Sequence, residues 1–597
     1  MFEETRGARI ETGTWQDARA SMGSPPSKRG APWALTEGRV VLKVGALFNK
    51  TTEMEIPARK HKSWLSLDLG NKATGDTSWE PLDGPDLRRL SDEPEVGAST
   101  AKEAAEPSGQ GGQARWGERG GAKEPELLVI EEERAEPMTA AVVASQLAAL
   151  IGPQKVETGE AVLAGHAGDK WYASALPEVV VFAESTADVS AVLAFAHRHR
   201  IPVTTRGAGV GYVGGCVPVK GGIVLTTARM NRILGIFPAD GVAVVQPGVI
   251  TGVLQHAARE VGWDYPPDPA SLKECSIGGN IATNAGGPRC LKYGVTRSYV
   301  LGLEVVLANG RVLRTGGRLH KNKTGFDLIG TFVGSEGMLG VVTEATLRLI
   351  PRPAARGMLA AVFPDFAMAA AAVQRILNSG HLPSALEITD AFTLAAARRR
   401  LGAEVFPPGD AHLIVEIDGR PAAVRSELEE LYVLLGRLGA THIDVAPDEE
   451  SCERIWKLRR EFSYSLRDTG LTKLNEDIVV PRSKLVDLVS FARLLEVETG
   501  IPIACFGHAG DGNIHTNLMV RDYDRPEVRE RADAALDILF HWVLAQGGAI
   551  TGEHGVGLAK KPWIAEALGG VSMAVHRSIK RTFDPHGILN PGKFLDP

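Results

Sequence analysis

Two histidines flank an Asp-Gly pair late in this sequence, in the segment IPIACFGHAGDGNIHTNLMV. An Asp-Gly pair between apolar runs is a strong signal for a two-residue hairpin turn. With Asp511-Gly512 as that turn, His508 faces His515 across the hairpin. Directly opposed residues have Cβ atoms about 4.5–5.5 Å apart, so the two imidazoles could share one metal ion. Asn517 is expected on the same face of the strand, where it is a candidate to contact a substrate.

A carboxylate in the segment TGEHGVG could complete a metal site. Two histidines with Glu553 and one open coordination position suit catalytic Zn²⁺, and Mn²⁺ or Fe²⁺ would also fit. The sequence separation does not place Glu553 beside the histidines. A polar network without a metal is therefore the alternative interpretation.

Three glycine-rich segments precede this cluster, at residues 209–214, 276–287 and 334–340. The first matches G-x-G-x-x-G, but it continues as GCVPVKGGIVLT, which is typical of a strand rather than of the helix that a Rossmann site requires. The Rossmann interpretation is therefore rejected, and a loop whose N–H groups could hold an anion is left. Each segment alone could be a tight turn, whereas the three together favour a ligand that the backbone approaches closely.

Composition excludes several classes of protein. The chain has 597 residues, 44% hydrophobic and 23% charged, with a net charge of -6, which is typical of a globular protein of several domains that does not bind nucleic acid through bulk charge. Its five cysteines lack the spacing of a disulfide framework or of an iron–sulfur cluster held by this chain alone. No apolar run approaches the length of a membrane span, and the first residues lack a secretory signal.

Strand and helix patterns describe two folded regions. From about Pro177, EVVVFAE predicts a strand, TADVSAVLAFAHRHR a helix with Thr186 as N-cap, and IPVTTR the next strand. Short strands bounded by glycine continue to about Pro351. After it, two tandem strand–helix–strand units predict a ferredoxin-like antiparallel sheet. Two further strands are expected around IPIACFGHAG and NIHTNLMV, and the last residues are expected to be helical.

Residues 1–137 differ from the rest. They lack sustained apolar periodicity and are rich in polar residues, a composition typical of disorder. Met138 is followed at once by TAAVVASQLAALIG, a plausible first helix. We therefore expect residues 1–137 to be a disordered or mis-annotated extension, with translation starting near Met138.

The chain resembles the FAD-linked oxidases of the vanillyl-alcohol-oxidase superfamily, in the branch of glycolate oxidase and D-lactate dehydrogenase (cytochrome). The motifs that carry the resemblance are RGAGVGYVGG, PPDPASLKECSIGGNIATNAGG, KYGVT, FVGSEGMLGVVTEATL and LNPGKF. It implies an α+β protein with a PCMH-type FAD-binding domain at 138–353. A ferredoxin-like α+β cap domain for the substrate follows at 354–540, and a C-terminal helical segment at 541–597 returns to the FAD domain.

The resemblance also implies which residues bind FAD, which we expect to be non-covalent because Cys216 lies past the glycine turn. Val210 stands where the family commonly has Thr or Ser, so one hydroxyl contact to phosphate is lost. The implied cofactor-binding residues are Arg206, Gly207, Ala208, Gly209, Val210, Gly211, Pro267, Asp268, Ser276, Gly278, Gly279, Asn280, Asn284, Gly286, Gly287, Tyr293, Gly340, Val341, Val342 and Asn590.

H-x-G-D-G-N-x-H followed by E-H-G is the metal and catalytic signature of that family, and it is intact here. By resemblance, His554 is the general base, and Arg459 in a W-x-x-R helix segment binds the substrate carboxylate. Lys473 matches the family's second cation. For Arg459 or Lys473 alone, a solvated surface position is the alternative.

The implied reaction is FAD-dependent oxidation of a D-2-hydroxy acid, D-lactate or glycolate, to the 2-keto acid. An external acceptor must take the electrons: an iron–sulfur subunit, an electron-transfer flavoprotein, a cytochrome or a quinone. This predicts a cytoplasmic protein, or one held at the membrane by its acceptor. The alternatives are a non-redox enzyme of the alkylglycerone-phosphate synthase type and a non-catalytic flavin-binding partner subunit.

Overall fold

The computed structural model describes residues 33–36, 39–44, 52–57 and 138–595. The first three ranges are strands of one antiparallel sheet, β1 (Trp33–Thr36), β2 (Arg39–Val44) and β3 (Thr52–Pro57). The rest of residues 1–137 lies outside the described residues. The expectation that this extension is disordered or mis-annotated therefore concerns residues that the structure does not describe.

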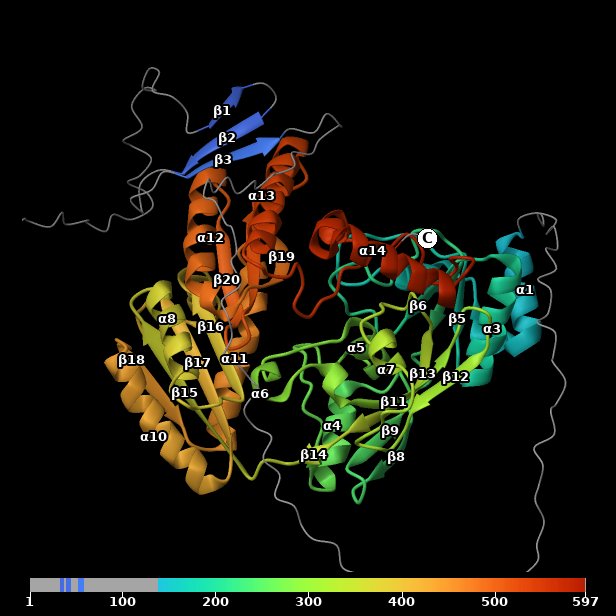
Figure 1. The fold of residues 1–597 in the computed structure, drawn as a ribbon, viewed down its shortest axis with the longest axis horizontal. Coiled ribbons are helices and arrows are strands. Elements are labelled where there is room, and N and C mark those ends of the chain that lie inside the picture. Colours follow the sequence, from blue (N-terminus) through green and yellow to red (C-terminus); the bar gives the residue numbers. More distant parts are fainter. Residues whose placement is uncertain (1–32, 37–38, 45–51, 58–137, 596–597) are drawn as a thin grey trace, which may run out of the picture. The chain divides into compact units, whose positions relative to one another are not determined.

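Two sheets build the region from Met138 to Pro351 (Figure 1). The first has the order β4-β5-β7-β6, and the second has the order β12-β11-β13-β9-β8. Their strands are β4 (Val156–Glu157), β5 (Val179–Phe182), β6 (Val203–Arg206), β7 (Ile223–Thr226), β8 (Ile233–Phe237), β9 (Val242–Val245), β11 (Val300–Val306), β12 (Val312–Gly316) and β13 (Val341–Arg348). A separate short pair joins β10 (Trp263–Asp264) to β14 (Ile350–Pro351).

Seven α-helices within residues 138–351 accompany these strands. They are α1 (Ala140–Ile151), α2 (Glu160–Gly165), α3 (Thr186–His199), α4 (Thr251–Glu260), α5 (Ile277–Thr283), α6 (Cys290–Tyr293) and α7 (Leu328–Phe332). The N-cap of α3 is Ser185 rather than the predicted Thr186, because Ser185 and Asp188 form a capping box in which each side chain bonds the other's backbone N–H.

The first part of the glycine-rich segment at 276–287 is a short helix, not the turn or loop that its small residues suggested. Ser276 accepts a hydrogen bond from the N–H of Gly279 and begins α5, which ends at Asn284 in the left-handed conformation (φ 52°). The segment at 209–214 contains no helix and leads to β7, so the rejection of the Rossmann interpretation is confirmed.

A seven-stranded antiparallel sheet forms the second region, in the order β18-β15-β17-β16-β20-β21-β19. Its strands are β15 (Ala355–Phe363), β16 (Ala385–Asp390), β17 (Ala411–Gly419), β18 (His442–Ala446), β19 (Thr472–Val479), β20 (Ile503–His508) and β21 (Asn513–Val520). The first four strands have the ferredoxin-like order. Strand β19 adds a third strand to the two that the sequence predicted after them.

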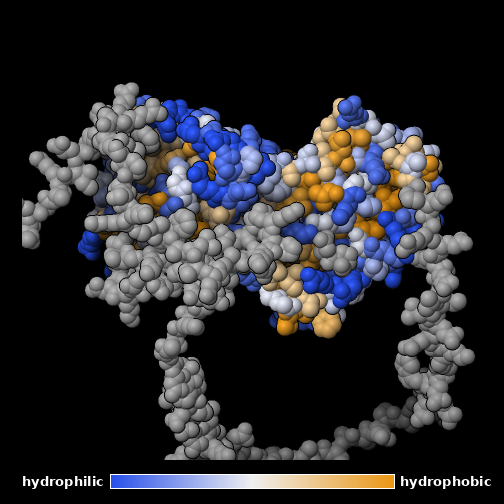
Figure 2. Space-filling model, turned by 90° about the horizontal axis from the view of Figure 1, so that it is seen from above, coloured by the Kyte–Doolittle hydropathy of each residue, from blue (hydrophilic) through white to orange (hydrophobic). Residues whose placement is uncertain are grey.

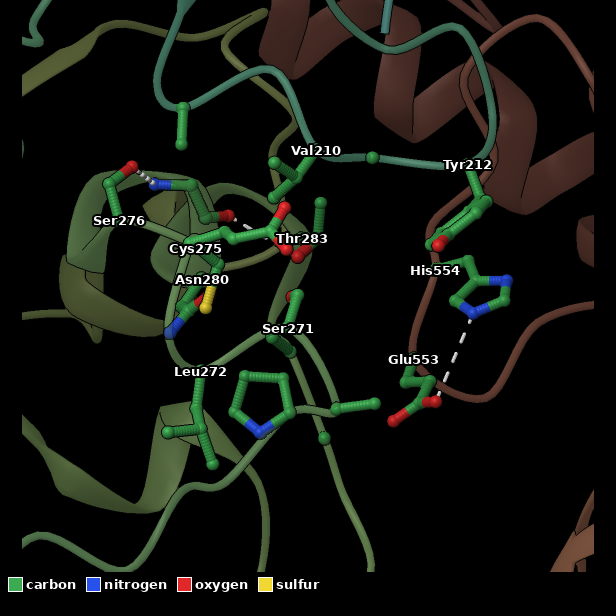
Figure 3. A pocket seen from close by; sticks show the side chains of 18 of the residues that line it. Val210, Tyr212, Ser271, Leu272, Cys275, Ser276, Asn280, Thr283, Glu553 and His554 are labelled. Carbon is green, nitrogen blue, oxygen red and sulfur yellow. Dashed lines mark hydrogen bonds and ion pairs between the residues drawn. The ribbon is translucent and has the colours of Figure 1, made fainter. Parts of the chain in front are cut away.

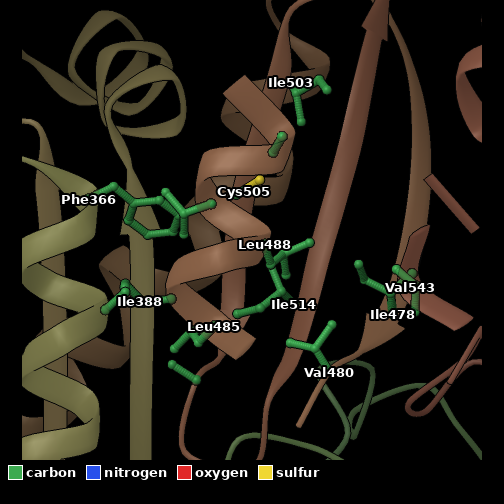
Figure 4. Packing of buried hydrophobic residues seen from close by; sticks show 14 of the residues in the cluster. Phe366, Ile388, Ile478, Val480, Leu485, Leu488, Ile503, Cys505, Ile514 and Val543 are labelled. Carbon is green, nitrogen blue, oxygen red and sulfur yellow. The ribbon is translucent and has the colours of Figure 1, made fainter. Parts of the chain in front are cut away.

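Helices cover both faces of this sheet. Residues from α8, α10, α12 and α13 share one large core with Leu413, Ile478 and Ile514, and Figure 4 shows the part of this core around Ile478 and Ile514. Helices α9 and α11 pack on the other face. The helices are α8 (Phe366–Leu377), α9 (Ala391–Leu401), α10 (Pro421–Arg437), α11 (Glu449–Arg467), α12 (Leu485–Thr499) and α13 (Pro526–Ala545). The last helix, α14 (Ile564–Phe583), returns to the N-terminal sheets, where Phe583 packs edge-on against Phe332 of α7.

The hairpin that carries the two histidines has a different register from the predicted one. His508 pairs with Asn513, and Phe506 pairs with His515, so the loop spans residues 509–512. The two-residue turn does not form because strand β16 binds the loop: the N–H of Gly510 donates to the carbonyl of Leu386 (3.1 Å). A shift of two residues leaves every side chain on its original face, and the two imidazole centroids are 5.4 Å apart.

The surface differs between the two regions. In Figure 2, the half that contains the seven-stranded sheet presents mainly hydrophilic residues, and the half that contains α1 and α14 shows more hydrophobic ones. None of the helices between Ala140 and Phe583 combines the length and the apolar character needed to cross a lipid bilayer.

Candidate functional site

A cavity of about 900 Å³ lies between the glycine-rich segments and the seven-stranded sheet. This volume falls within the range of small-molecule and cofactor sites. In Figure 3, Ser276, Asn280 and Thr283 line one side, and Tyr212, Glu553 and His554 line the other. The cavity therefore joins the two groups of residues that the sequence marked separately.

Strand alternation places the polar residues of the second region on one face of its sheet. On β21, Ile514 and Leu518 enter the large core, so His515 between them points to the opposite face. The same alternation turns Glu387 of β16 and Asp477 of β19 to the face of His515. A buried row of ionisable groups thus faces the glycine-rich segments.

His508, His515 and Glu553 meet at one point of this face. One ligand atom from each lies within 4.8 Å of the other two, and the Nε2 atoms of His508 and His515 are 3.7 and 3.4 Å from Glu553 Oε1. All three are largely buried. Two imidazoles and one carboxylate form a donor set that suits a divalent transition metal. The side chains therefore fit a metal ion.

Glu387 binds both a histidine of this cluster and a nearby arginine. Its Oε1 atom is 2.5 Å from Nδ1 of His508, and its Oε2 atom accepts hydrogen bonds from Nε (2.8 Å) and Nη2 (2.6 Å) of Arg459. Burial favours a higher pKa for Glu387, but His508 and Arg459 outweigh it and hold the pKa at about 2. A carboxylate that orients a ligating histidine is typical of metal sites. Sequence reasoning missed Glu387, which lies 121 residues before His508.

Asp477 organises the loop that carries Glu553 and His554. Its Oδ2 atom accepts hydrogen bonds of 2.9 Å from the N–H groups of Gly552, Glu553 and His554 and from the hydroxyl of Thr551. Burial alone would raise the Asp477 pKa. The neighbouring His554 and Lys560, together with these donors, hold the pKa well below its usual value. Sequence reasoning missed Asp477 as well. The signal for it is the alternation of Lys473, Asn475 and Asp477, which places the three side chains on the same face of a strand.

His554 lies at the cavity wall with its side chain 13% exposed. Burial lowers the pKa of its imidazole below the usual value. The neighbouring residues of its loop are fixed by Glu336, which accepts the N–H groups of Val556 (2.7 Å) and Gly557 (2.8 Å). A neutral imidazole held in a cavity is able to accept a proton.

Arg459 and Lys473 also line the cavity, close to the Phe506 ring, with Arg459 Cζ 4.8 Å and Lys473 Nζ 5.5 Å from its centroid. Lys473 donates to the hydroxyl of Ser463 (3.0 Å). Burial, with two nearby arginines, lowers the pKa of Lys473 to about 7. Asn517 is absent from the cavity lining, and its amide donates to the backbone carbonyls of Ala504 and His515.

Most of the expected cofactor residues line the cavity. Those that do so are Gly207, Ala208, Gly209, Val210, Gly211, Asp268, Ser276, Gly278, Gly279, Asn280, Gly286, Gly340, Val341 and Val342. Six do not: Arg206, Pro267, Asn284, Gly287, Tyr293 and Asn590.

These six residues make contacts behind the cavity wall. Arg206 bonds the carbonyl of Gly168, and Pro267 accepts from Gln255. Asn284 accepts from the N–H of Arg297, and Gly287 lies where an added Cβ would be 2.5 Å from the carbonyl oxygen of Asp268. Tyr293 donates to Asp418, and Asn590 donates to the carbonyls of Gly215 and Glu336.

At two glycine positions of the cavity wall, Gly207 and Gly278, a side chain would collide with a neighbouring residue. A Cβ added to Gly207 would be 2.6 Å from the Ser276 hydroxyl, and one added to Gly278 would be 2.6 Å from Pro247 Cβ. The buried hydroxyl oxygen of Thr205 also lines the cavity and has no hydrogen-bond partner within 138–595. Exposed backbone groups, small residues and an unpaired hydroxyl fit a large polar cofactor such as FAD.

A buried ion-pair network joins the two regions beside the cavity. Arg289 contacts Asp268 (2.5 Å) and binds Glu416 of β17 through Nε (2.7 Å) and Nη2 (2.8 Å). Trp456 of α11 donates to the same Glu416 (2.7 Å). This network fixes the helix that carries Arg459 relative to the cofactor segments.

Comparisons with known proteins match the two regions of the chain separately. A model of the FAD binding domain matches residues 177–316, and a model of the C-terminal domain of FAD linked oxidases matches residues 352–594. The chain is 38% identical over 455 residues to "Glycolate oxidase subunit GlcD" of Bacillus subtilis, covering 76% of this chain and 96% of that protein. It is 35% identical over 454 residues to "D-lactate dehydrogenase" of Anaerostipes hadrus, covering 74% and 95%.

Solved structures share the fold. P-cresol methylhydroxylase superposes with a TM-score of 0.64 at 22% identity, covering 76% of this chain and 96% of the other. An alkyldihydroxyacetonephosphate synthase superposes with a TM-score of 0.60 at 22% identity, covering 76% and 85%. At such identities the likeness concerns the fold alone.

Proposed function

This chain belongs to the FAD-linked oxidases, and we propose that it oxidises a D-2-hydroxy acid, D-lactate or glycolate, to the 2-keto acid. The observation that carries the proposal is the cluster of His508, His515 and Glu553 beside His554, at the wall of a glycine-lined cavity. Relatives named as a glycolate oxidase component and as D-lactate dehydrogenase support the same substrate class.

Oxidation of a 2-hydroxy acid removes the hydroxyl proton and a hydride from Cα. His554 takes the proton, because burial keeps its imidazole neutral near pH 7. His508, His515 and Glu553 would hold a divalent metal, Zn²⁺ or else Mn²⁺ or Fe²⁺, which lowers the pKa of a bound hydroxyl group. FAD, when bound, supplies the hydride acceptor.

Arg459 and Lys473 bind the substrate carboxylate in this proposal. Both cations line the cavity beside the Phe506 ring, and Glu387 holds the Arg459 guanidinium in place. A fixed guanidinium matches the planar geometry of a carboxylate. The electrons then pass to an external acceptor, for which an iron–sulfur subunit, an electron-transfer flavoprotein, a cytochrome or a quinone is suitable. A protein held at the membrane by such an acceptor would need no membrane span of its own.

An anaerobic titration tests the proposal. The purified protein, with its flavin spectrum recorded, receives D-lactate, L-lactate, glycolate or D-2-hydroxyglutarate. We expect one D-acid or glycolate to bleach the flavin, the bleaching to be lost after chelation, and added Zn²⁺, Mn²⁺ or Fe²⁺ to restore it. Flavin that no acid bleaches would contradict the proposal and favour a non-redox enzyme or a partner-dependent subunit.

The His554→Ala variant is the matched control for the titration. It should keep the flavin spectrum and lose bleaching, because the base is removed while the glycine-lined cavity wall is unchanged. Bleaching at the wild-type rate in this variant would exclude His554 as the base.

A further inference from the structure

Within residues 138–595, no hydrogen bond orients the imidazole of His554. Its backbone N–H donates to Asp477 Oδ2 (2.9 Å), but its buried Nδ1 atom has no hydrogen-bond partner among residues 138–595 and is 4.0 Å from that same oxygen. The Nε2 atom is 3.9 Å from Glu553 Oε1, beyond hydrogen-bond length. Another contact must therefore hold the ring.

Aromatic packing supplies that contact. The Tyr212 ring lies 5.3 Å from the His554 ring, centroid to centroid, at an interplanar angle of 33°. The His515 ring lies 5.5 Å from His554 at 24°. In Figure 3 the Tyr212 side chain reaches down from the glycine-rich segment and lies directly beside His554.

Tyr212 is itself held on both sides along the chain. The carbonyl of Gly211 accepts the N–H of Lys170 (2.9 Å), and the carbonyl of Val213 accepts the N–H groups of Leu558 (2.7 Å) and Ala559 (3.1 Å). The last two donors belong to the loop that follows His554. The segment carrying Tyr212 and the loop carrying His554 are thus joined by backbone hydrogen bonds.

The phenol group adds a contact to the second region. Its oxygen accepts a hydrogen bond from Nη2 of Arg467, at the end of α11, at 3.5 Å. Helix α11 also carries Arg459. This contact is long and exposed, so the ring rather than the hydroxyl supplies most of the restraint on His554.

We infer that Tyr212 is a positioning residue for the proposed reaction: its ring holds the imidazole of His554 in the orientation that accepts the substrate proton. The inference rests on the proposed function. Loss of the ring would leave the base free to turn, and a misplacement of ~1 Å in a reacting group can lower the rate about 100-fold. Substrate binding depends on other residues, so KM should change little.

Single-turnover reduction of bound flavin tests the inference, with rates expressed per bound flavin. With the acid that reduces the wild type, we expect Tyr212→Phe to reduce flavin within about two-fold of the wild-type rate. Tyr212→Leu should be about 10- to 100-fold slower, and the acid concentration that gives half the maximal reduction rate should stay within about three-fold of the wild type. Tyr432→Leu, which removes a tyrosine from α10 outside the cavity lining, is the control and should match the wild type. A wild-type rate in Tyr212→Leu, or equal losses in the Phe and Leu variants, would overturn the inference.

A second measurement does not require activity. Diethyl pyrocarbonate modifies neutral imidazoles, and peptide mass spectrometry reports the rate at His554. We expect this rate to rise at least three-fold in Tyr212→Leu and to stay at the wild-type value in Tyr212→Phe and Tyr432→Leu. An unchanged rate in Tyr212→Leu would show that the ring does not restrain His554. If no acid reduced the wild type, the proposed function would fail and this rate alone would decide the role of Tyr212.

Discussion

Replacing Glu387 with glutamine should weaken the metal site although none of its three ligands is itself replaced. The carboxylate is fully buried and uses both oxygens, Oε1 toward His508 Nδ1 and Oε2 toward Arg459. A glutamine amide has one acceptor and one donor group. Whichever way it turns, its NH₂ group faces either an imidazole N–H or a guanidinium, and one charge-assisted hydrogen bond is lost.

The size of the effect follows from that loss. A hydrogen bond to a charged group contributes about 1.5–3 kcal/mol. Loss of an outer carboxylate typically lowers metal affinity about 10- to 100-fold, or about 1.4–2.7 kcal/mol. The two ranges agree, so we expect the Kd for Zn²⁺ to rise about 10- to 100-fold in Glu387→Gln.

The assay is a competition titration. Protein freed of metal by dialysis against a chelator is titrated with Zn²⁺ in the presence of a chromophoric chelator. Glu416→Gln is the matched control, because Glu416 is equally buried and also binds an arginine, Arg289, but contacts none of the three ligands. Its Kd should stay within about two-fold of the wild type. A wild-type Kd in Glu387→Gln would refute the role of Glu387, and a wild-type protein that binds no Zn²⁺, Mn²⁺ or Fe²⁺ would refute the site.

Three other changes have distinct expected outcomes. His554→Gln should lower the rate of flavin reduction about 10²- to 10⁴-fold, the usual contribution of a general base, while the flavin-to-protein absorbance ratio stays constant; a smaller loss would argue for another base. Lys473 has a pKa of about 7, so it loses its positive charge as the pH rises through that value; KM for the acid should increase above pH 7, and Lys473→Arg should remove the increase, since arginine stays charged. Gly207→Ala would place a Cβ 2.6 Å from the Ser276 hydroxyl, so bound flavin measured from its visible absorbance should fall, whereas Gly165→Ala, with open space around its Cβ position, should retain it.

Local patterns predicted the elements of the fold and part of the site. The alternation of apolar residues along β20 and β21 places His508 and His515 on one face of the sheet. A shift of the pairing by two residues does not change this face. That is why the two imidazoles lie together although the turn is longer than predicted. The proline and glycines after residue 214 were sufficient to exclude a Rossmann helix. These inferences hold because side-chain direction in a strand depends only on residue parity.

Other features could not be derived from local patterns. Residues 277–283 include two glycines and other weak helix formers, so helix propensity alone favours a loop there. The segment is nevertheless a helix, and Ser276 caps its N-terminus. Strand β19, which the sequence did not predict beside the histidine hairpin, has charged residues on the face that proved to be buried. It pairs with β21, but most partners of its charges come from elsewhere: the loop at 551–554 donates to Asp477, and Ser463 of α11 accepts from Lys473.

The sequence by itself determined the residue types of the site, the strand face of its two histidines and the small residues of the cavity wall. Only the tertiary structure decided which distant residues meet them. Glu387 lies 121 residues before His508, and Asp477 lies 77 residues before His554. Tyr212 reaches His554 from the glycine-rich segment of the other region. Contacts across such separations depend on how sheets and loops pack, because buried charges are stable only where the fold brings them a partner.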